Sequence, residues 1–364
     1  MKKIDANFLE PSQQQLNSLI KYYQCGRYVD AKNLSLSITQ EFPEHQFAWK
    51  VLGAALKQMG KLNESVVASQ KSVQLNPQDT EAYNNLGVIL NEQGRLKEAE
   101  TSLRKAITLK PDYARARYNL GITLKKFGRL NEAEASYKKA IALNPDYAEA
   151  HNNLGALLKE LERSDEAEAS IRQAIELNPD YAEAHNNLGK ILMDLNKLDE
   201  AEKSFSRAIE LKPYYKPALL NMGKIQFDKN KFELSLRNYD LCDTEESRGL
   251  ALSCLYNLGQ IQDIYKRIEK NCELDDKNIT VAAFSSFISK KEKKETAHKF
   301  CNNPIDFINI SNLSSYLKNS NLFINEVIEE LKTIDTVWED KTTYNGFHSV
   351  NRIDIFENPL EKLK

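Results

Sequence analysis

A 12-residue stretch of this chain occurs twice in identical form. Asn-Pro-Asp-Tyr-Ala-Glu-Ala-His-Asn-Asn-Leu-Gly runs from Asn144 to Gly155 and again from Asn178 to Gly189. The same 34-residue offset relates two longer series, which are the glycines Gly53, Gly87, Gly121, Gly155, Gly189 and Gly223 and the prolines Pro43, Pro77, Pro111, Pro145, Pro179 and Pro213. A fixed period of this length indicates a repeat architecture that grows by stacking. The period therefore outweighs the two or three globular domains that 364 residues would otherwise favour.

One unit, residues 114–147, shows what each repeat is expected to form. A first helix carries Leu120 and Gly121, and the glycine permits close approach of another helix. Gly128 is expected to end this helix in a left-handed turn, and a second helix then begins near Leu130. Alanines recur every 34 residues on the second helix, at Ala99, Ala133, Ala167 and Ala201 and at Ala106, Ala140, Ala174 and Ala208. Each unit is therefore predicted to be an antiparallel helix pair that the following proline terminates.

Two details of the turns lead to separate predictions. Asp146 and Asp180 are each followed three residues later by a glutamate, a spacing typical of a capping box at a helix N-terminus. Glu162 stands where the other units have glycine or asparagine, so its turn is expected to be strained or built differently.

The period also divides the chain. Residues 1–45 are predicted to be a divergent first repeat or cap, with helices over 11–25 and 28–41, and residues 46–240 are the main array. Residues 241–302 keep helical spacing over 250–258, 261–274 and 281–297 and are expected to form degenerate hairpins that cap the stack. Residues 303–364 differ in character, with a strand-like stretch at 304–310 and an amphipathic helix at 322–334, and we expect a separate, truncated piece there.

Composition excludes several functions. A net charge of −2 provides no strong field for nucleic acid or an anionic membrane. With no run of 18 apolar residues and no apolar run behind the first two lysines, we expect neither a membrane-spanning helix nor a signal peptide. The five cysteines are scattered and odd in number, which favours reduced thiols and a cytoplasmic location. No phosphate-binding loop, hydrolase motif or metalloprotease motif occurs, so we expect no enzyme activity, no catalytic residue and no cofactor.

The repeated pattern of leucine-glycine, alanine 12 residues later, alanine 7 further and proline 5 beyond resembles that of tetratricopeptide repeats over roughly residues 12–240. This resemblance implies an all-α, right-handed superhelical solenoid whose first helices line a concave groove. In such a groove the family holds protein or extended peptide segments. The aromatic residue that the family places early in the first helix survives only as Trp49 and Tyr83.

Five asparagines, each two residues before a repeat glycine, form the main candidate site. A mid-helix asparagine costs about 0.5 kcal/mol relative to alanine, so its repetition favours a function. We call these residues the ladder: Asn85, Asn119, Asn153, Asn187 and Asn221. The repeats resemble the superhelical part of O-linked N-acetylglucosamine transferases, which implies that such amides pair with the backbone of an extended peptide. The alternative is that these asparagines face water or a neighbouring helix.

Further groove candidates follow from the same resemblance, namely Asn84, Tyr118, Asn152, Asn186, Lys190 and Lys224. Asparagine replaces the first lysine of the family's carboxylate clamp at 84, 152 and 186, which disfavours a partner's C-terminal carboxylate as the ligand. His151 and His185 occupy equivalent positions, but no third ligand has suitable spacing, so no metal site is expected.

The stretch from Trp338 to Phe356 resembles the opening of 2-oxoglutarate/Fe(II)-dependent oxygenases that bacteria fuse behind such repeats. The histidine-x-acid motif of those enzymes is absent, since no histidine of this chain has an acid two residues later. The sequence thus favours a non-enzymatic scaffold that binds a protein or peptide. Two alternatives stay open, the targeting portion of a larger hydroxylase and a purely structural assembly scaffold, and the oligomeric state is undetermined.

Overall fold

The computed structural model describes residues 10–298, and within them all regular structure is α-helical. The helices are α1 (Gln13–Gln24), α2 (Tyr28–Glu41), α3 (Gln46–Gln58), α4 (Leu62–Leu75), α5 (Thr80–Glu92), α6 (Leu96–Leu109), α7 (Ala114–Lys126), α8 (Leu130–Leu143), α9 (Ala148–Glu160), α10 (Ser164–Leu177), α11 (Ala182–Asp194), α12 (Leu198–Leu211), α13 (Lys216–Asp228), α14 (Phe232–Cys242), α15 (Glu245–Asn257), α16 (Ile261–Lys270) and α17 (Ile279–Glu292). The predicted all-α class is confirmed. Contacts divide the chain into two compact units that meet between Ile191 and Leu192, inside α11.

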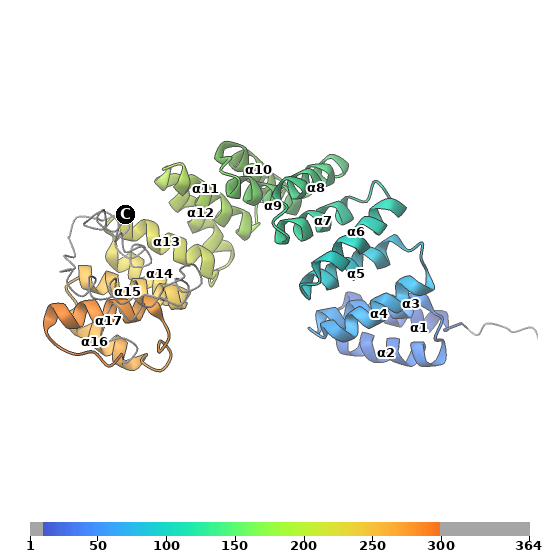
Figure 1. Cartoon of the computed structure of the whole chain (residues 1–364), viewed down its shortest axis with the longest axis horizontal. Helices are drawn as coiled ribbons and strands as arrows, with labels where there is room; N and C mark the ends of the chain where they lie inside the picture. The colour runs from blue at the N-terminus through green and yellow to red at the C-terminus, as the bar shows by residue number, and fades with distance from the viewer. Residues whose placement is uncertain (1–9, 299–364) are drawn as a thin grey trace, which may run out of the picture. The chain divides into compact units, whose positions relative to one another are not determined.

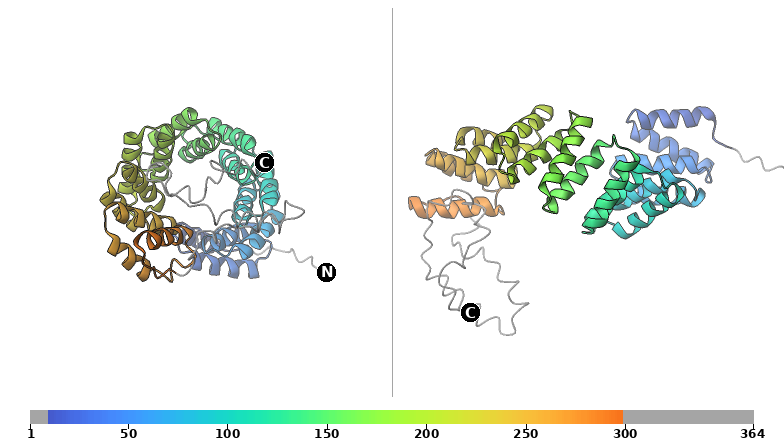
Figure 2. Two further views of the ribbon diagram at one scale, coloured as in Figure 1. Left: turned by 60° about the vertical axis from the view of Figure 1, so that its left-hand side comes forward. Right: turned by 90° about the horizontal axis from the view of Figure 1, so that it is seen from above.

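The first unit is a stack of antiparallel helix pairs, coloured blue to green in Figures 1 and 2. Each helix packs on the next one along the chain, and the first helix of a pair also packs on the first helix of the next pair, as α3 does on α5 and α5 on α7. Helices α3, α5, α7, α9 and α11 therefore bring equivalent residues of successive repeats together. This arrangement is what positions the ladder.

The repeat glycines allow the two helices of a pair to touch. A β-carbon on Gly121 would lie 2.5 Å from the ring of Tyr137, and one on Gly155 would lie 2.6 Å from Ile171. Any larger residue at these positions would have to displace a buried side chain, because Tyr137 is 1% exposed and Ile171 is fully buried. The eight alanines of the second helices are likewise completely buried, as the sequence predicts.

The turn inside each pair adopts the left-handed conformation that the sequence predicts. Gly94 and Gly128 have φ values of +76° and +75°, and Glu162 has the same conformation with φ 61°. Glu162 therefore keeps the geometry of its neighbours, although an L-residue other than glycine is strained there. The predicted strain is located at this residue, and the shape of the turn is unchanged.

The predicted capping box at Asp146 is wrong. Helix α9 is capped by Tyr147, which makes no side-chain capping hydrogen bond, and the Ala150 amide instead bonds to the Tyr147 carbonyl at 3.0 Å. Asp146 lies one residue too early for its carboxylate to serve the helix. Where an aspartate occupies the cap position itself, it does cap: Asp79 accepts a hydrogen bond from the Ala82 amide at 2.9 Å before α5.

In the second unit the helix pairs continue where the sequence period is lost. Only 29 residues separate the starts of α13 and α15, but 34 again separate α15 from α17. The loss arises at the end of α14, which stops at Cys242 and is followed by a left-handed Asp243 with φ 43° in place of the usual proline junction. Thr244 then begins α15 with a capping box. The expected hairpin at 250–274 is therefore present, but its first helix begins five residues earlier than predicted, at Glu245 in place of Leu250.

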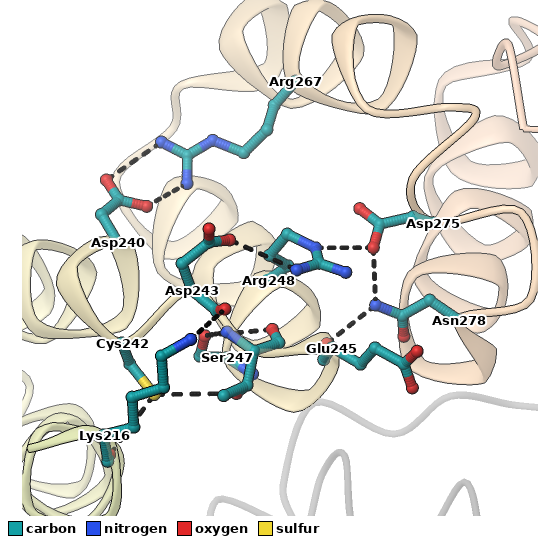
Figure 3. Close-up of polar contacts among 11 residues, drawn as sticks. Lys216, Asp240, Cys242, Asp243, Glu245, Ser247, Arg248, Arg267, Asp275 and Asn278 are labelled. Atoms are coloured by element: carbon teal, nitrogen blue, oxygen red, sulfur yellow. Dashed lines mark hydrogen bonds and ion pairs between the residues drawn. The ribbon is translucent and has the colours of Figure 1, made fainter. Parts of the chain in front are cut away.

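Polar contacts hold the end of the second unit together (Figure 3). The Arg248 guanidinium contacts the carboxylate of Asp275 at 2.6 Å, and Asp275 also accepts a hydrogen bond from the Asn278 side-chain amide at 2.9 Å. Asp275 is 2% exposed, so this pair is almost fully desolvated. Beside it, the aromatic and aliphatic side chains of α15, α16 and α17 form a core around Leu252, Phe284 and Ile288.

The predictions for residues 303–364, including the strand-like and helical stretches and the resemblance to oxygenases, lie outside the described residues. The proposed limits of the main array at residues 46 and 240 stay predictions.

Candidate functional site

Four ladder asparagines of the first unit occupy equivalent, half-buried positions. Asn85, Asn119, Asn153 and Asn187 lie on α5, α7, α9 and α11, and each is of intermediate exposure. The fifth, Asn221, is also partly exposed and lies on α13 in the second unit. The helices on which the first four lie belong to successive repeats, so the stacking brings these amides into one series.

Each of three ladder amides donates a hydrogen bond to the preceding repeat. The Asn119 Nδ2 donates to Asn84 Oδ1 at 2.8 Å, and the Asn187 Nδ2 donates to Asn152 Oδ1 at 2.9 Å. The Asn153 Nδ2 donates to the hydroxyl of Tyr118 at 2.9 Å. The ladder therefore does face a neighbouring helix, as the alternative interpretation expects, but with one donor only. An asparagine amide has a second N–H donor and two acceptor lone pairs on its oxygen, and this contact uses none of them.

The hydrogen bonds to Asn84 and Asn152 also fix which way the amides of Asn119 and Asn187 point. An amide oxygen such as Asn84 Oδ1 can only accept, so Nδ2 of Asn119 must face it, and Oδ1 of Asn119 must face away. Within the described part of the chain, no side chain or backbone group donates to the Asn119 Oδ1. This oxygen is therefore an oriented acceptor on the surface of α7.

The residue before each ladder position has a different role from the one predicted. Asn84, Asn152 and Asn186 are 0%, 4% and 4% exposed, so their side chains lie in the interior and do not line a groove. Asn84 and Asn152 accept the ladder bonds, and their own Nδ2 groups point toward Asn85 and Asn153 at 3.5 Å and 3.4 Å. These asparagines thus support the ladder, because burial requires that their polar atoms be satisfied within the protein.

Tyr118 is the exception in this series. It replaces the buried asparagine and is half-buried, and its ring lies 4.8 Å from that of Tyr147 and 6.0 Å from that of Tyr137, centroid to centroid. Tyr181, at the next junction, accepts a long hydrogen bond of 3.4 Å from the Asn152 side chain. Burial raises the pKa of the Tyr118, Tyr147 and Tyr181 phenols, so all three stay neutral at physiological pH.

The two predicted groove lysines differ in environment. Lys190 is exposed on α11. Lys224, on α13, forms an ion pair with Glu246 at 2.6 Å, so its charge is already balanced within the second unit. Lys224 would have to leave Glu246 before it could bind a carboxylate of a partner.

The sequence interpretation missed Lys50, which stands 34 residues before Asn84 and so is a lysine at the clamp position. Its ammonium group contacts Asp79 at 3.1 Å and Glu81 at 2.9 Å, and Gln46 donates to the same Asp79 at 2.8 Å. Burial lowers the pKa of Lys50 and these two acids raise it, with a net rise. Lys50 is thus charged and already bound to carboxylates of the next repeat. The 34-residue spacing from Asn84 was the signal that identifies it.

His151 and His185 have structural contacts. Their Nε2 atoms lie 3.0 Å and 2.9 Å from the carbonyls of Pro145 and Pro179. The indole N–H of Trp49 makes the same contact with Pro43 at 2.8 Å. The histidines therefore reproduce the hydrogen bond of the family's aromatic residue. Among residues 10–298, no three acidic, histidine or cysteine side chains gather in a way that could hold a metal ion.

The described helices also bear on the membrane question. None of them, within residues 10–298, combines the length and the apolar character needed to cross a bilayer.

Comparisons with known proteins agree with the fold of helix pairs. Three family profiles, each described as tetratricopeptide repeat, match residues 78–146, 136–169 and 157–216. A solved structure from a functional characterisation of Pseudomonas aeruginosa pilF has a TM-score of 0.52 and 22% identity, covering 58% of this chain and all of that one. Two others have lower scores. MamA has a TM-score of 0.41 with 26% identity, covering 44% of this chain and 95% of its own. YrrB, titled a TPR protein with an unusual peptide-binding site, has a TM-score of 0.40 and 27% identity, covering 48% of this chain and 90% of its own. No curated protein compared with the chain matches it.

Proposed function

We propose that this chain, in which residues 78–216 are tetratricopeptide repeats, is a scaffold that binds an extended segment of a partner protein along its ladder face. The ladder face consists of Asn85, Asn119, Asn153 and Asn187 with the helix surfaces around them. Repeats of this kind are typical of protein–protein interaction, and the chain contains no catalytic motif that the sequence could identify. The ladder specifies how the partner is held.

The observation that carries the proposal is the orientation of the ladder amides. Asn119 and Asn187 each donate one hydrogen bond to a buried asparagine, and this bond holds the amide plane in one orientation. A preoriented amide binds a peptide group without losing rotamer freedom, which lowers the entropic cost of association. Because a backbone amide and carbonyl are the same in every residue, such a row would bind the main chain of a segment whatever its side chains.

The spacing of the repeats favours an extended partner. Packed helices lie about 8–10 Å apart, and an extended chain advances about 3.3 Å per residue. One repeat therefore corresponds to roughly three partner residues. A helical partner would advance only about 1.5 Å per residue and would offer no free backbone groups.

The test uses the full chain and a library of random linear 16-residue peptides displayed on phage. Wild-type protein should enrich peptides over an unrelated helical protein. The triple variant Asn119→Ala, Asn153→Ala and Asn187→Ala should bind the same synthetic peptides at least about tenfold more weakly, at about 0.5–1.5 kcal/mol per rung. Unchanged affinity of the triple variant in a titration would rule out the ladder as the binding element.

This triple variant also loses stability, because Asn84 and Asn152 are left buried with an unsatisfied oxygen. We expect a loss of about 1–3 kcal/mol of unfolding free energy for each of Asn119→Ala and Asn187→Ala. A core variant such as Leu103→Ala, whose fully buried side chain packs against Gly87 and forms no hydrogen bond to a ladder amide, serves as a control of reduced stability. It should unfold at lower denaturant concentration and still bind the peptides with wild-type affinity.

A further inference from the structure

The first two turns of α9 combine a carboxylate with a ladder amide. Glu149, Asn152 and Asn153 are spaced three and four residues apart, so they share one face of the helix. Asn153 donates to the hydroxyl of Tyr118, and Asn152 donates to that of Tyr181. Tyr118 of α7 and Tyr181, which precedes α11, are thereby both bonded to side chains of α9.

The aromatic part of the cluster is rigid. Tyr118 contacts Tyr147 with a centroid distance of 4.8 Å and an interplanar angle of 43°, and it leans on Tyr137 at 6.0 Å. Tyr137 is 1% exposed, so it acts as a fixed support behind Tyr118. With its hydroxyl bonded to Asn153 and its ring packed on two others, Tyr118 has little freedom left.

Glu149 supplies a negative charge that nothing in residues 10–298 neutralises. It is exposed, and within this range it forms no ion pair. The equivalent acid of an earlier repeat, Glu81, is paired with Lys50 at 2.9 Å. The charge of Glu149 acts on the surrounding phenols: after burial, it contributes to the raised pKa of Tyr118, Tyr147 and Tyr181.

Arg115 is a basic residue whose charge acts on Tyr147. Its charge lowers the pKa of Tyr147 against the larger effect of burial, and it acts in the same way on Tyr113 at the previous junction. Among residues 10–298 no basic side chain, Arg115 included, forms an ion pair with Glu149, so the carboxylate is open to a further cation.

We infer that Tyr118, Tyr147, Tyr181 and Glu149 form a subsite for one cationic side chain, arginine or lysine, of the extended segment held by the ladder. The rings offer negatively polarised faces to a cation, and the carboxylate gives it a counter-charge. The adjacent Asn153 binds the main chain of the same segment, so the subsite sets the register of a partner that the ladder alone would bind in any register. This inference rests on the proposed function.

The repeats provide matched variants for the test. Tyr118→Asn introduces the residue that the neighbouring repeats have at this position, and an asparagine there can accept the bond from Asn153 as Asn84 accepts one from Asn119. Glu149→Gln removes the charge and keeps the size. Glu183→Gln is the control, because Glu183 occupies the same first-turn position on α11 but follows a repeat that has Asn152 in place of the tyrosine.

The experiment selects the random 16-residue phage library on the full-length wild-type chain and on each variant, with circular dichroism to verify folding. Wild-type selections should enrich arginine or lysine at one fixed position about fivefold or more over the starting library. This enrichment should disappear with Glu149→Gln and Tyr118→Asn and persist with Glu183→Gln. In one selected synthetic peptide, arginine→citrulline should weaken binding about tenfold to wild type and less than twofold to Glu149→Gln.

Failures of the two proposals are distinguishable. Peptides enriched without a fixed basic position, or a basic position that survives both Glu149→Gln and Tyr118→Asn, would overturn the cationic subsite and leave the peptide-binding scaffold intact. Selections that enrich no peptide above the unrelated helical protein would overturn both. Enrichment lost equally with Glu183→Gln would show a diffuse charge effect and also contradict the subsite.

Discussion

The regular repeats of the first unit and the last helices of the second unit build the same kind of helix pair by different means. In α7–α10, glycines and buried alanines let the helices touch, and proline junctions set the length of each unit. The junction between α14 and α15 is shorter, and on α15 the position equivalent to the repeat glycines is Leu252, which is 1% exposed. The helices there pack through large side chains around Phe284 and Ile288.

The difference shows which parts of the repeat signature are required for the architecture. The repeat glycines serve the contact inside a pair, whereas Gly249 on α15 serves the contact with α17 of the next pair. A β-carbon on Gly249 would lie 2.3 Å from Thr280 on α17. The C-terminal region adds a buried ion pair, Arg248 with Asp275, that the regular repeats lack at this depth of burial.

The largest expected effect is at this ion pair. Asp275→Ala leaves the Arg248 guanidinium, whose side chain is 13% exposed, without its buried counter-charge, and it removes the acceptor for the Asn278 amide. We expect a loss of about 3–5 kcal/mol of unfolding free energy. Urea denaturation with hydrogen exchange should locate the loss in α15–α17. Asp275→Asn, which keeps an acceptor, should lose less, and a loss spread evenly over both units would contradict the comparison.

The next effect concerns the glycine contact of the regular repeats. Gly155→Ala places a methyl group 2.6 Å from Ile171 and 3.0 Å from the Ala167 carbonyl. Because the backbone atom cannot rotate away, the variant should lose about 1–3 kcal/mol despite alanine's higher helix propensity. The double variant Gly155→Ala with Ile171→Val should recover part of the loss, as measured by the urea midpoint. Without any recovery, the crowding must come from the backbone contact alone.

The smallest effect is a gain of stability. Glu162 has φ 61° where the preceding turns have glycine and the following ones asparagine, so Glu162→Gly should relieve strain and stabilise the chain by about 0.5–1 kcal/mol. Gly128→Ala is the matched control: its φ is +75° and a β-carbon there meets nothing within 4 Å, so its effect is purely conformational. It should destabilise by about 1 kcal/mol. Thermal unfolding of the two variants should shift in opposite directions.

Much of the fold could be predicted, because the residues that define it repeat along the chain. Helix α2 has the bounds that the sequence predicts, Tyr28–Glu41. The capping box at Asp146 was wrong by one residue, since the spacing of aspartate and glutamate does not reveal which residue begins the helix. The five-residue shift after α14 was also missed, because a shortened junction removes the proline and glycine on which the period was recognised.

The candidate site was predicted only in outline. The series of ladder asparagines could be found from their spacing, but not the burial of Asn84, Asn152 and Asn186 beside them. Neighbouring positions on a helix point in directions about 100° apart, and only the packing of the next repeat decides which of them is covered. The pairing of Lys50 with Asp79 and Glu81 has the same origin.

The sequence by itself determined that this chain forms antiparallel helix pairs, where the pairs touch and which amides recur. These properties depend on residues within one 34-residue repeat, whose spacing is visible in the sequence. The tertiary structure decided which way the amides point, that Tyr118 meets Tyr147, and that Glu149 stays unpaired within residues 10–298. Those properties depend on contacts between successive repeats, such as Asn119 with Asn84 and Asn187 with Asn152. Such contacts exist only once the repeats are stacked.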